Sequence, residues 1–106
     1  MPTVTVHAGE KHKQQRIIVA VGTTLIIGNS GCSLVTPIRI SLVPGDGGSM
    51  TLEQQVADGG EWWFITGFND VTAIMSKELR TTFIEVPLNA LRINALLSQG
   101  IVEIAQ

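Results

Sequence analysis

The sequence has 106 residues, which suits one domain and leaves no room for a second module of similar size. Only 15% of the residues are charged, against about a quarter in an average soluble domain, while 44% are hydrophobic. The net charge of −2 argues against a nucleic-acid-binding protein, because phosphate contacts need a basic face. So few charges indicate that part of the surface meets protein rather than water.

A long uncharged stretch, residues 17–38, raises the question of a membrane span, since 22 residues can cross a bilayer. Turn-forming residues at 22–24 and 28–31 interrupt it, and its apolar members are mostly β-branched. Two strands of a soluble domain explain the stretch better, so we expect no membrane partner. The first residues lack a basic region followed by an apolar one, so we also expect no signal peptide.

The N-terminal segment alternates apolar and small polar residues. Val4 and Val6 alternate with threonines, which predicts a short first strand, followed by a polar loop over residues 8–15. Residues 1–16 carry three basic side chains against one acidic side chain. Two interpretations stay open: the valines belong to an ordinary strand of their own sheet, or residues 1–16 are an arm that adds a strand to a neighbouring chain.

Two strands are expected within residues 17–27, where apolar side chains occupy both alternating positions. Val19 and Leu25 fall on one face, whereas Ile18 and Ile26 fall on the other. The pattern predicts a strand pair that is buried on both sides, near the middle of a sheet or under a contact between subunits. Ile18 and Ile26 are for this reason candidate interface residues.

The rest of the chain continues in short alternating segments. Residues 37–43 and 49–56 flank a turn rich in proline and glycine, which predicts a hairpin. Residues 90–99 alternate like a strand but also contain good helix formers before Gly100, so strand and helix both stay open there. The predicted fold class is all-β: one domain over residues 1–106, as a small antiparallel β-sandwich or a jelly-roll-like barrel. Further strands are expected at 62–68, 71–75, 81–86 and 101–104.

Two parts of the chain resemble each other weakly. The segment 38–40 (Ile-Arg-Ile), a glycine turn and a strand reaching Glu53 are matched by 91–93 (Leu-Arg-Ile), Gly100 and a strand reaching Glu103. A true repeat and a chance similarity both stay open. In either case each part is expected to be a hairpin, with its Arg and Glu able to pair across strands on the solvent side.

No residue pattern typical of catalysis or metal binding is found. His7 and His12 flank a basic loop without further ligands at metal-binding spacing, and Cys32 has no second cysteine to pair with. No nucleophile-elbow motif occurs, and the acidic residues are spread singly along the chain. We therefore expect no catalytic residue, no cofactor, no metal and no enzymatic activity.

The adjacent tryptophans are the exception to this lack of signal. Neighbouring strand residues point to opposite faces, so Trp62 and Trp63 cannot both enter one core. At most one of the two rings is therefore expected in the core. For the other ring three interpretations stay open: it packs under a loop, binds a small ligand, or is buried against another subunit. The enrichment of tryptophan at interfaces supports the last of these. A small ligand- or carbohydrate-binding domain that uses an exposed tryptophan with Phe68 is therefore the alternative function.

The last third of the chain contains four distinctive segments: 60–63 (Gly-Glu-Trp-Trp), a strand ending in Val86 and Pro87, 90–93 (Ala-Leu-Arg-Ile) and 100–104 (Gly-Ile-Val-Glu-Ile). With these segments it resembles the small β-sandwich structural proteins of tailed bacteriophages, head decoration or cement proteins among them. The resemblance covers about residues 60–106. It implies a non-enzymatic virion component, made in the host cytoplasm, that binds the major capsid protein and other copies of itself, as a trimer ahead of a dimer. It supplies no catalytic residue.

Together, the sequence pattern and this resemblance predict a self-associating structural protein of a virion without nucleic-acid, membrane or cofactor partners. Burial on both faces of residues 17–27 and the low charge favour a homo-oligomer. The candidate interface residues are Val4, Val6, Ile18, Ile26, Trp62 and Trp63.

Overall fold

The computed structural model describes residues 3–6, 14–28, 34, 36–57, 59–72, 80–85 and 88–106. For residues 3–6 it describes the backbone only. Several sequence predictions lie outside the described residues: those for both histidines, for Cys32, for residues 8–13 of the predicted loop, for the turn-forming residues 29–31, for residues 73–75 of the strand predicted at 71–75, and for the strand end at Val86 and Pro87.

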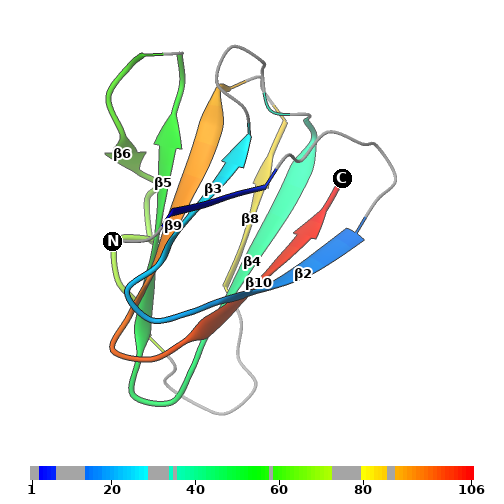
Figure 1. The fold of residues 1–106 in the computed structure, drawn as a ribbon. Helices are drawn as coiled ribbons and strands as arrows, with labels where there is room; N and C mark the ends of the chain where they lie inside the picture. Colours follow the sequence, from blue (N-terminus) through cyan, green and yellow to red (C-terminus); the bar gives the residue numbers. More distant parts are fainter. Residues whose placement is uncertain are drawn as a thin grey trace.

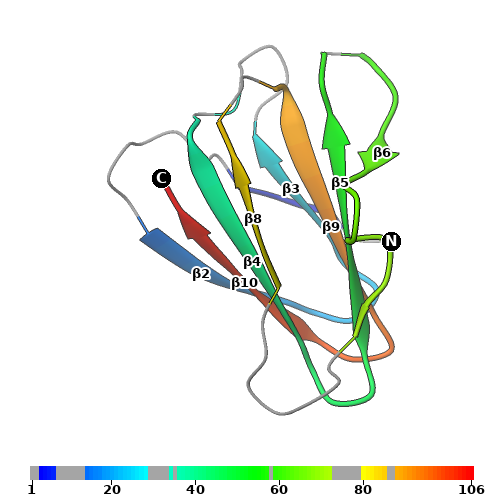
Figure 2. The same cartoon turned by 180° about the vertical axis from the view of Figure 1, so that it is seen from behind.

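The described residues form two sheets that pack face to face (Figures 1 and 2). Sheet A has the order β1 (Thr3–Val6), β3 (Thr24–Gly28), β9 (Ala90–Leu96), β5 (Ser49–Gln55) and β6 (Trp63–Phe64), with β7 (Val71–Thr72) also beside β5. Sheet B has the order β2 (Gln14–Val19), β10 (Gly100–Ala105), β4 (Ile38–Pro44) and β8 (Arg80–Ile84). The predicted all-β class is confirmed, and the architecture is a β-sandwich. Of the two alternatives for the segment that begins at residue 90, the structure has the strand, over residues 90–96.

The core fills the space between the sheets with the inward side chains of both. In β4 the two isoleucines point inward while Arg39, between them, is exposed; β9 alternates in the same way. Each fully buried aliphatic side chain contributes about 1.5–3 kcal/mol relative to an exposed one. The largest fully buried side chains are Val19, Leu25, Ile27, Ile38, Ile40, Leu42, Met50, Leu52, Leu91, Ile93 and Val102.

Most connections cross from one sheet to the other, and we call the short ones arches. β4 lies in sheet B and β5 in sheet A, and β9 and β10 are separated in the same way. The hairpins predicted at 37–56 and 91–104 are therefore wrong. The physical reason is that a hairpin and an arch place inward residues at the same alternating positions, so the pattern alone does not distinguish them.

The strand pair predicted within residues 17–27 is also wrong. β2 pairs with β10 at the edge of sheet B, whereas β3 lies between β1 and β9 in sheet A. Only the inward residues of the two strands are buried, and Ile18 is 57% exposed. β2 also begins at Gln14, inside the predicted loop, because its first residues pair with the end of β10.

The N-terminal strand lies within its own sheet. β1 runs parallel to β3, with Val4 opposite Leu25 and Val6 opposite Ile27. The described backbone therefore agrees with the first interpretation of this segment, an ordinary strand of its own sheet.

Three arches, at 20–23, 45–48 and 97–99, meet at one end of the sandwich, the lower end in Figure 1. The Gly22 amide donates a hydrogen bond to the Ala95 carbonyl at 3.2 Å, which ties the first arch to the end of β9. Gly45 lies so close to the Gln99 carbonyl oxygen that a Cβ at this position would overlap it. The arches are therefore packed together rather than free loops.

Gly45→Ala is expected to lower the free energy of unfolding by about 1–3 kcal/mol. The added methyl group would overlap a backbone oxygen that cannot rotate away. Urea denaturation measures the change. Gly47→Asn is the control, because nothing lies within 4 Å of a Cβ added there and asparagine tolerates the φ of 73°. An unchanged midpoint for Gly45→Ala would contradict the close packing of the arches.

Candidate functional site

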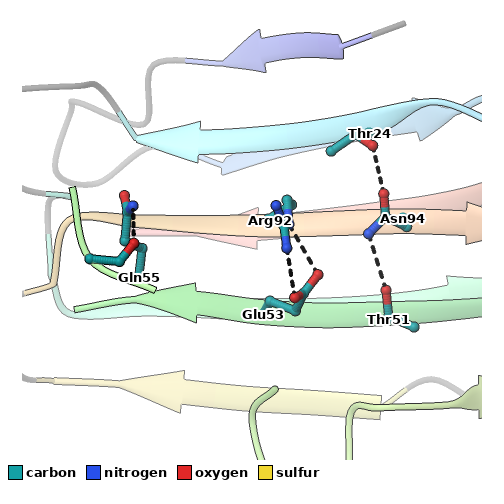
Figure 3. A network of polar contacts seen from close by, with 7 residues as sticks. Thr24, Thr51, Glu53, Gln55, Arg92 and Asn94 are labelled. Carbon is teal, nitrogen blue, oxygen red and sulfur yellow. Dashed lines mark hydrogen bonds and ion pairs between the residues drawn. The ribbon is translucent and has the colours of Figure 1, made fainter. Parts of the chain in front are cut away.

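The outer face of sheet A carries a row of polar side chains across three strands (Figure 3). Thr24 Oγ1 on β3 donates to Asn94 Oδ1 on β9 at 2.6 Å, and Asn94 Nδ2 donates to Thr51 Oγ1 on β5 at 3.4 Å. The three residues stand directly opposite one another in the strand register. Because a slip by one residue would turn these side chains into the core, the row helps to fix the register.

An ion pair lies beside this row. Arg92 donates through Nε to Glu53 Oε1 at 3.0 Å and through Nη2 to Oε2 at 2.8 Å (Figure 3). Glu53 is only 9% exposed, and the ring of Trp62 lies over the guanidinium with its centroid 4.6 Å from Cζ. The sequence predicted pairing within each Arg-Glu segment, which is wrong here, because β5 has β9 as its neighbour and Glu53 therefore meets Arg92.

A third contact ties the segment after β5 to sheet A. Asn89 Nδ2 donates to Gln55 Oε1 at 2.6 Å, and Gln55 Nε2 donates to the Gly60 carbonyl at 2.8 Å. Within the described residues, every buried side-chain nitrogen and oxygen has a hydrogen-bond partner. The described polar side chains on this face of sheet A thus form a hydrogen-bonded structural network.

Three exposed apolar residues lie on or near the edge strand β6 of sheet A, and we call them the aromatic edge: Val56, Trp63 and Phe64. Trp63 and Phe64 are neighbours on this strand, so their rings point to opposite faces of the sheet. Trp63 is 60% exposed and Phe64 is 55% exposed, on a strand of only two residues. The sequence predicted that one tryptophan enters the core, but neither does; Trp62 is half-buried over Arg92, and Phe68 is the buried ring. The predicted strand over 62–68 stops at Phe64 because the chain turns there.

Four further exposed apolar residues lie in the arches at 20–23 and 97–99 or within two residues of them, and we call them the arch patch: Ile18, Val21, Leu96 and Leu97. Leu97 is 85% exposed and has a φ of 71°. This left-handed conformation costs a residue with a branched side chain about 1–2 kcal/mol, which is why glycine or asparagine usually occupies it. Leu97 is not among the residues predicted from the sequence. The available signal was an adjacent pair of leucines between a strand and the Ser-Gln-Gly turn.

The candidate interface residues do not form one surface. Ile18 belongs to the arch patch and Trp63 to the aromatic edge. Ile26 is half-buried on the outer face of sheet A, opposite Arg92 in the register, and Trp62 covers the same arginine. Ile18 and Ile26, predicted to share a face, lie on different sheets, since β2 and β3 do not pair. The side chains of the β1 valines lie outside the described residues.

Metal binding and membrane spanning were examined over the described residues. In the described part of the chain, no three His, Cys, Asp or Glu residues are grouped so that they could hold a metal. No helix in the described ranges is long and apolar enough to cross a membrane. Comparison with protein-family models, curated proteins and solved structures gave no match. The two exposed apolar patches are therefore the features from which a function is inferred.

Arg92→Leu is expected to lower the free energy of unfolding by about 2–4 kcal/mol, because it leaves the Glu53 carboxylate buried without its partner. The double variant Glu53→Met with Arg92→Leu should recover most of this loss, since it removes the buried charge as well. Urea denaturation of both variants measures the difference.

Arg39→Leu is the matched control, because Arg39 is exposed at the corresponding position of sheet B; its effect should stay within about 0.5 kcal/mol. A loss for Arg92→Leu no larger than that for Arg39→Leu would contradict the structural role of the ion pair.

Proposed function

We propose that the chain is a non-enzymatic structural protein of a virion, a head decoration protein that binds other copies of itself and the major capsid protein. The assignment to a virion rests on the resemblance of residues 60–106 to phage structural proteins. The mode of action rests on the two exposed patches.

The exposure and the left-handed backbone conformation of Leu97 are the observations that support a binding role. Its conformation costs about 1–2 kcal/mol, and its exposed side chain gains nothing from burial within the chain. Burial of a leucine against a partner contributes about 1.5–3 kcal/mol, which is enough to offset that cost. Backbone strain at an exposed apolar residue is the combination expected where a side chain is held ready for a partner.

The positions of the patches favour a bridging role. β5 begins directly after the arch at 45–48, and its opposite end pairs with β6, so the arch patch and the aromatic edge lie toward opposite ends of the sandwich (Figure 1). A subunit with two different patches can contact two neighbours at once. Bridging contacts of this kind stabilise an assembled shell through mass action, because they form only on the assembly.

Leu97→Asn is expected to make the isolated protein about 1 kcal/mol more stable while it weakens self-association and capsid binding. Asparagine tolerates the left-handed conformation but removes the apolar contact. Sedimentation velocity at high micromolar concentration and co-sedimentation with purified expanded phage capsids measure the two losses. A wild-type chain that stays monomeric and does not sediment with capsids would contradict the proposal.

Phe83→Thr is the control for this variant. Phe83 is also exposed, but it lies on the outer face of sheet B outside both patches, so its replacement should leave association unchanged. An equal loss for Phe83→Thr would show that exposed apolar area in general, and not the arch patch, causes the association.

The exposure of the Trp63 ring favours a second candidate function, a small ligand- or carbohydrate-binding domain. In a Trp62→Phe variant the remaining indole reports on this edge alone, so a sugar that stacks on it should shift or quench its fluorescence. The Trp63→Phe variant is the control. Emission that no sugar of a glycan panel changes would eliminate this candidate.

A further inference from the structure

We infer that the outer face of sheet B holds a binding site for a compact dicarboxylate. The face has a hollow of about 390 Å³, at the lower end of the range typical of ligand sites. None of the residues that line it belongs to the arch patch or the aromatic edge. The lining includes Gln14 and Arg16 on β2, Glu103 and Ala105 on β10, and Arg39 and Ser41 on β4.

The hollow exists because a small side chain stands between long ones. Ala105 on the central strand β10 lies opposite Gln14 on one side and opposite Arg39 on the other. The alanine methyl group fills little of the space that the two flanking side chains enclose. The floor of the hollow is therefore sheet B itself, and its walls are polar.

The charges that line the hollow are not paired with one another. Arg16 stands opposite Glu103 in the register, and Arg39 stands opposite Ala105. In the part of the chain that the structure describes, neither guanidinium makes a hydrogen bond or an ion pair. Among the described residues that line the hollow, two arginines stand against one carboxylate, which is an excess of positive charge in a protein whose net charge is −2.

In sheet A, the position opposite the outward-facing arginine is occupied by a carboxylate of the chain itself. There Glu53 stands directly opposite Arg92, which grips both of its oxygens, and Trp62 covers the pair. In sheet B the corresponding arginine, Arg39, has an alanine opposite it, and the corresponding carboxylate, Glu103, stands two residues earlier on that strand. The position that Glu53 fills beside Arg92 is thus open beside Arg39.

The chemistry of the walls selects the ligand class. A guanidinium presents a planar fork that matches a carboxylate, and Arg16 and Arg39 enter the hollow from strands two positions apart. A ligand with two carboxylates can engage both forks. Glu103 repels further negative charge, which disfavours polyanions, and the amide of Gln14 offers a neutral hydrogen-bond donor.

The test is a titration of the ¹⁵N-labelled full chain with succinate, followed by amide NMR shifts. Saturable shifts are expected on β2, β10 and β4 around the hollow. Arg16→Gln and Arg39→Gln should each weaken binding about tenfold, since each removes a charge-assisted contact. Glu103→Gln should strengthen binding, because it removes the repelling charge.

Asp46→Asn is the matched control for Glu103→Gln: it changes the net charge equally but lies on an exposed arch away from the hollow. Affinity should stay unchanged in this variant. The inference is overturned if the shifts do not saturate, if Asp46→Asn strengthens binding as much as Glu103→Gln, or if both arginine variants bind like the wild type. Inorganic phosphate, titrated in parallel, should bind more weakly. Equal binding of phosphate would show an unselective anion patch and would also overturn the inference.

Discussion

Each sheet is completed by one of the last two strands of the chain. β9 lies between β3 and β5 in sheet A, and β10 lies between β2 and β4 in sheet B. β9 supplies Leu91 and Ile93 to the core and Arg92 to the ion pair with Glu53. The arch between β9 and β10 carries Leu97. The core, the polar face and the arch patch therefore depend on the same short stretch, because β3 and β5 are joined only through β9 in the described sheet.

The sequence predicts individual strands well and their pairing poorly. Alternation places Ile38, Ile40 and Leu42 inward correctly, since the side-chain period of a strand is a local property. Pairing is not local: Glu53 and Arg92 meet across 39 positions of sequence. A turn such as 45–48 can lead to a hairpin or to an arch with identical alternation, and only the competition among all strands decides between them.

The candidate site was predictable only in part, and for similar reasons. Trp63 and Ile18 stand out in the sequence as large apolar residues that one core cannot accommodate, and both are exposed. The role of Trp62 as a cover for Arg92 requires the register of β5 against β9. The positive φ of Leu97 is set by the geometry of its arch, which a leucine does not indicate, since leucine avoids that conformation.

The central position of β9 and β10 has a consequence for biosynthesis. Chains grow at about 5–20 residues per second, and domains generally fold as units once they have been synthesised. Until residues 90–105 have left the ribosome, β3 and β5 lack the strand between them, and so do β2 and β4. The nascent chain therefore carries apolar strands with open edges until both sheets can close, and chaperones that shield such edges should engage it until β9 and β10 have emerged.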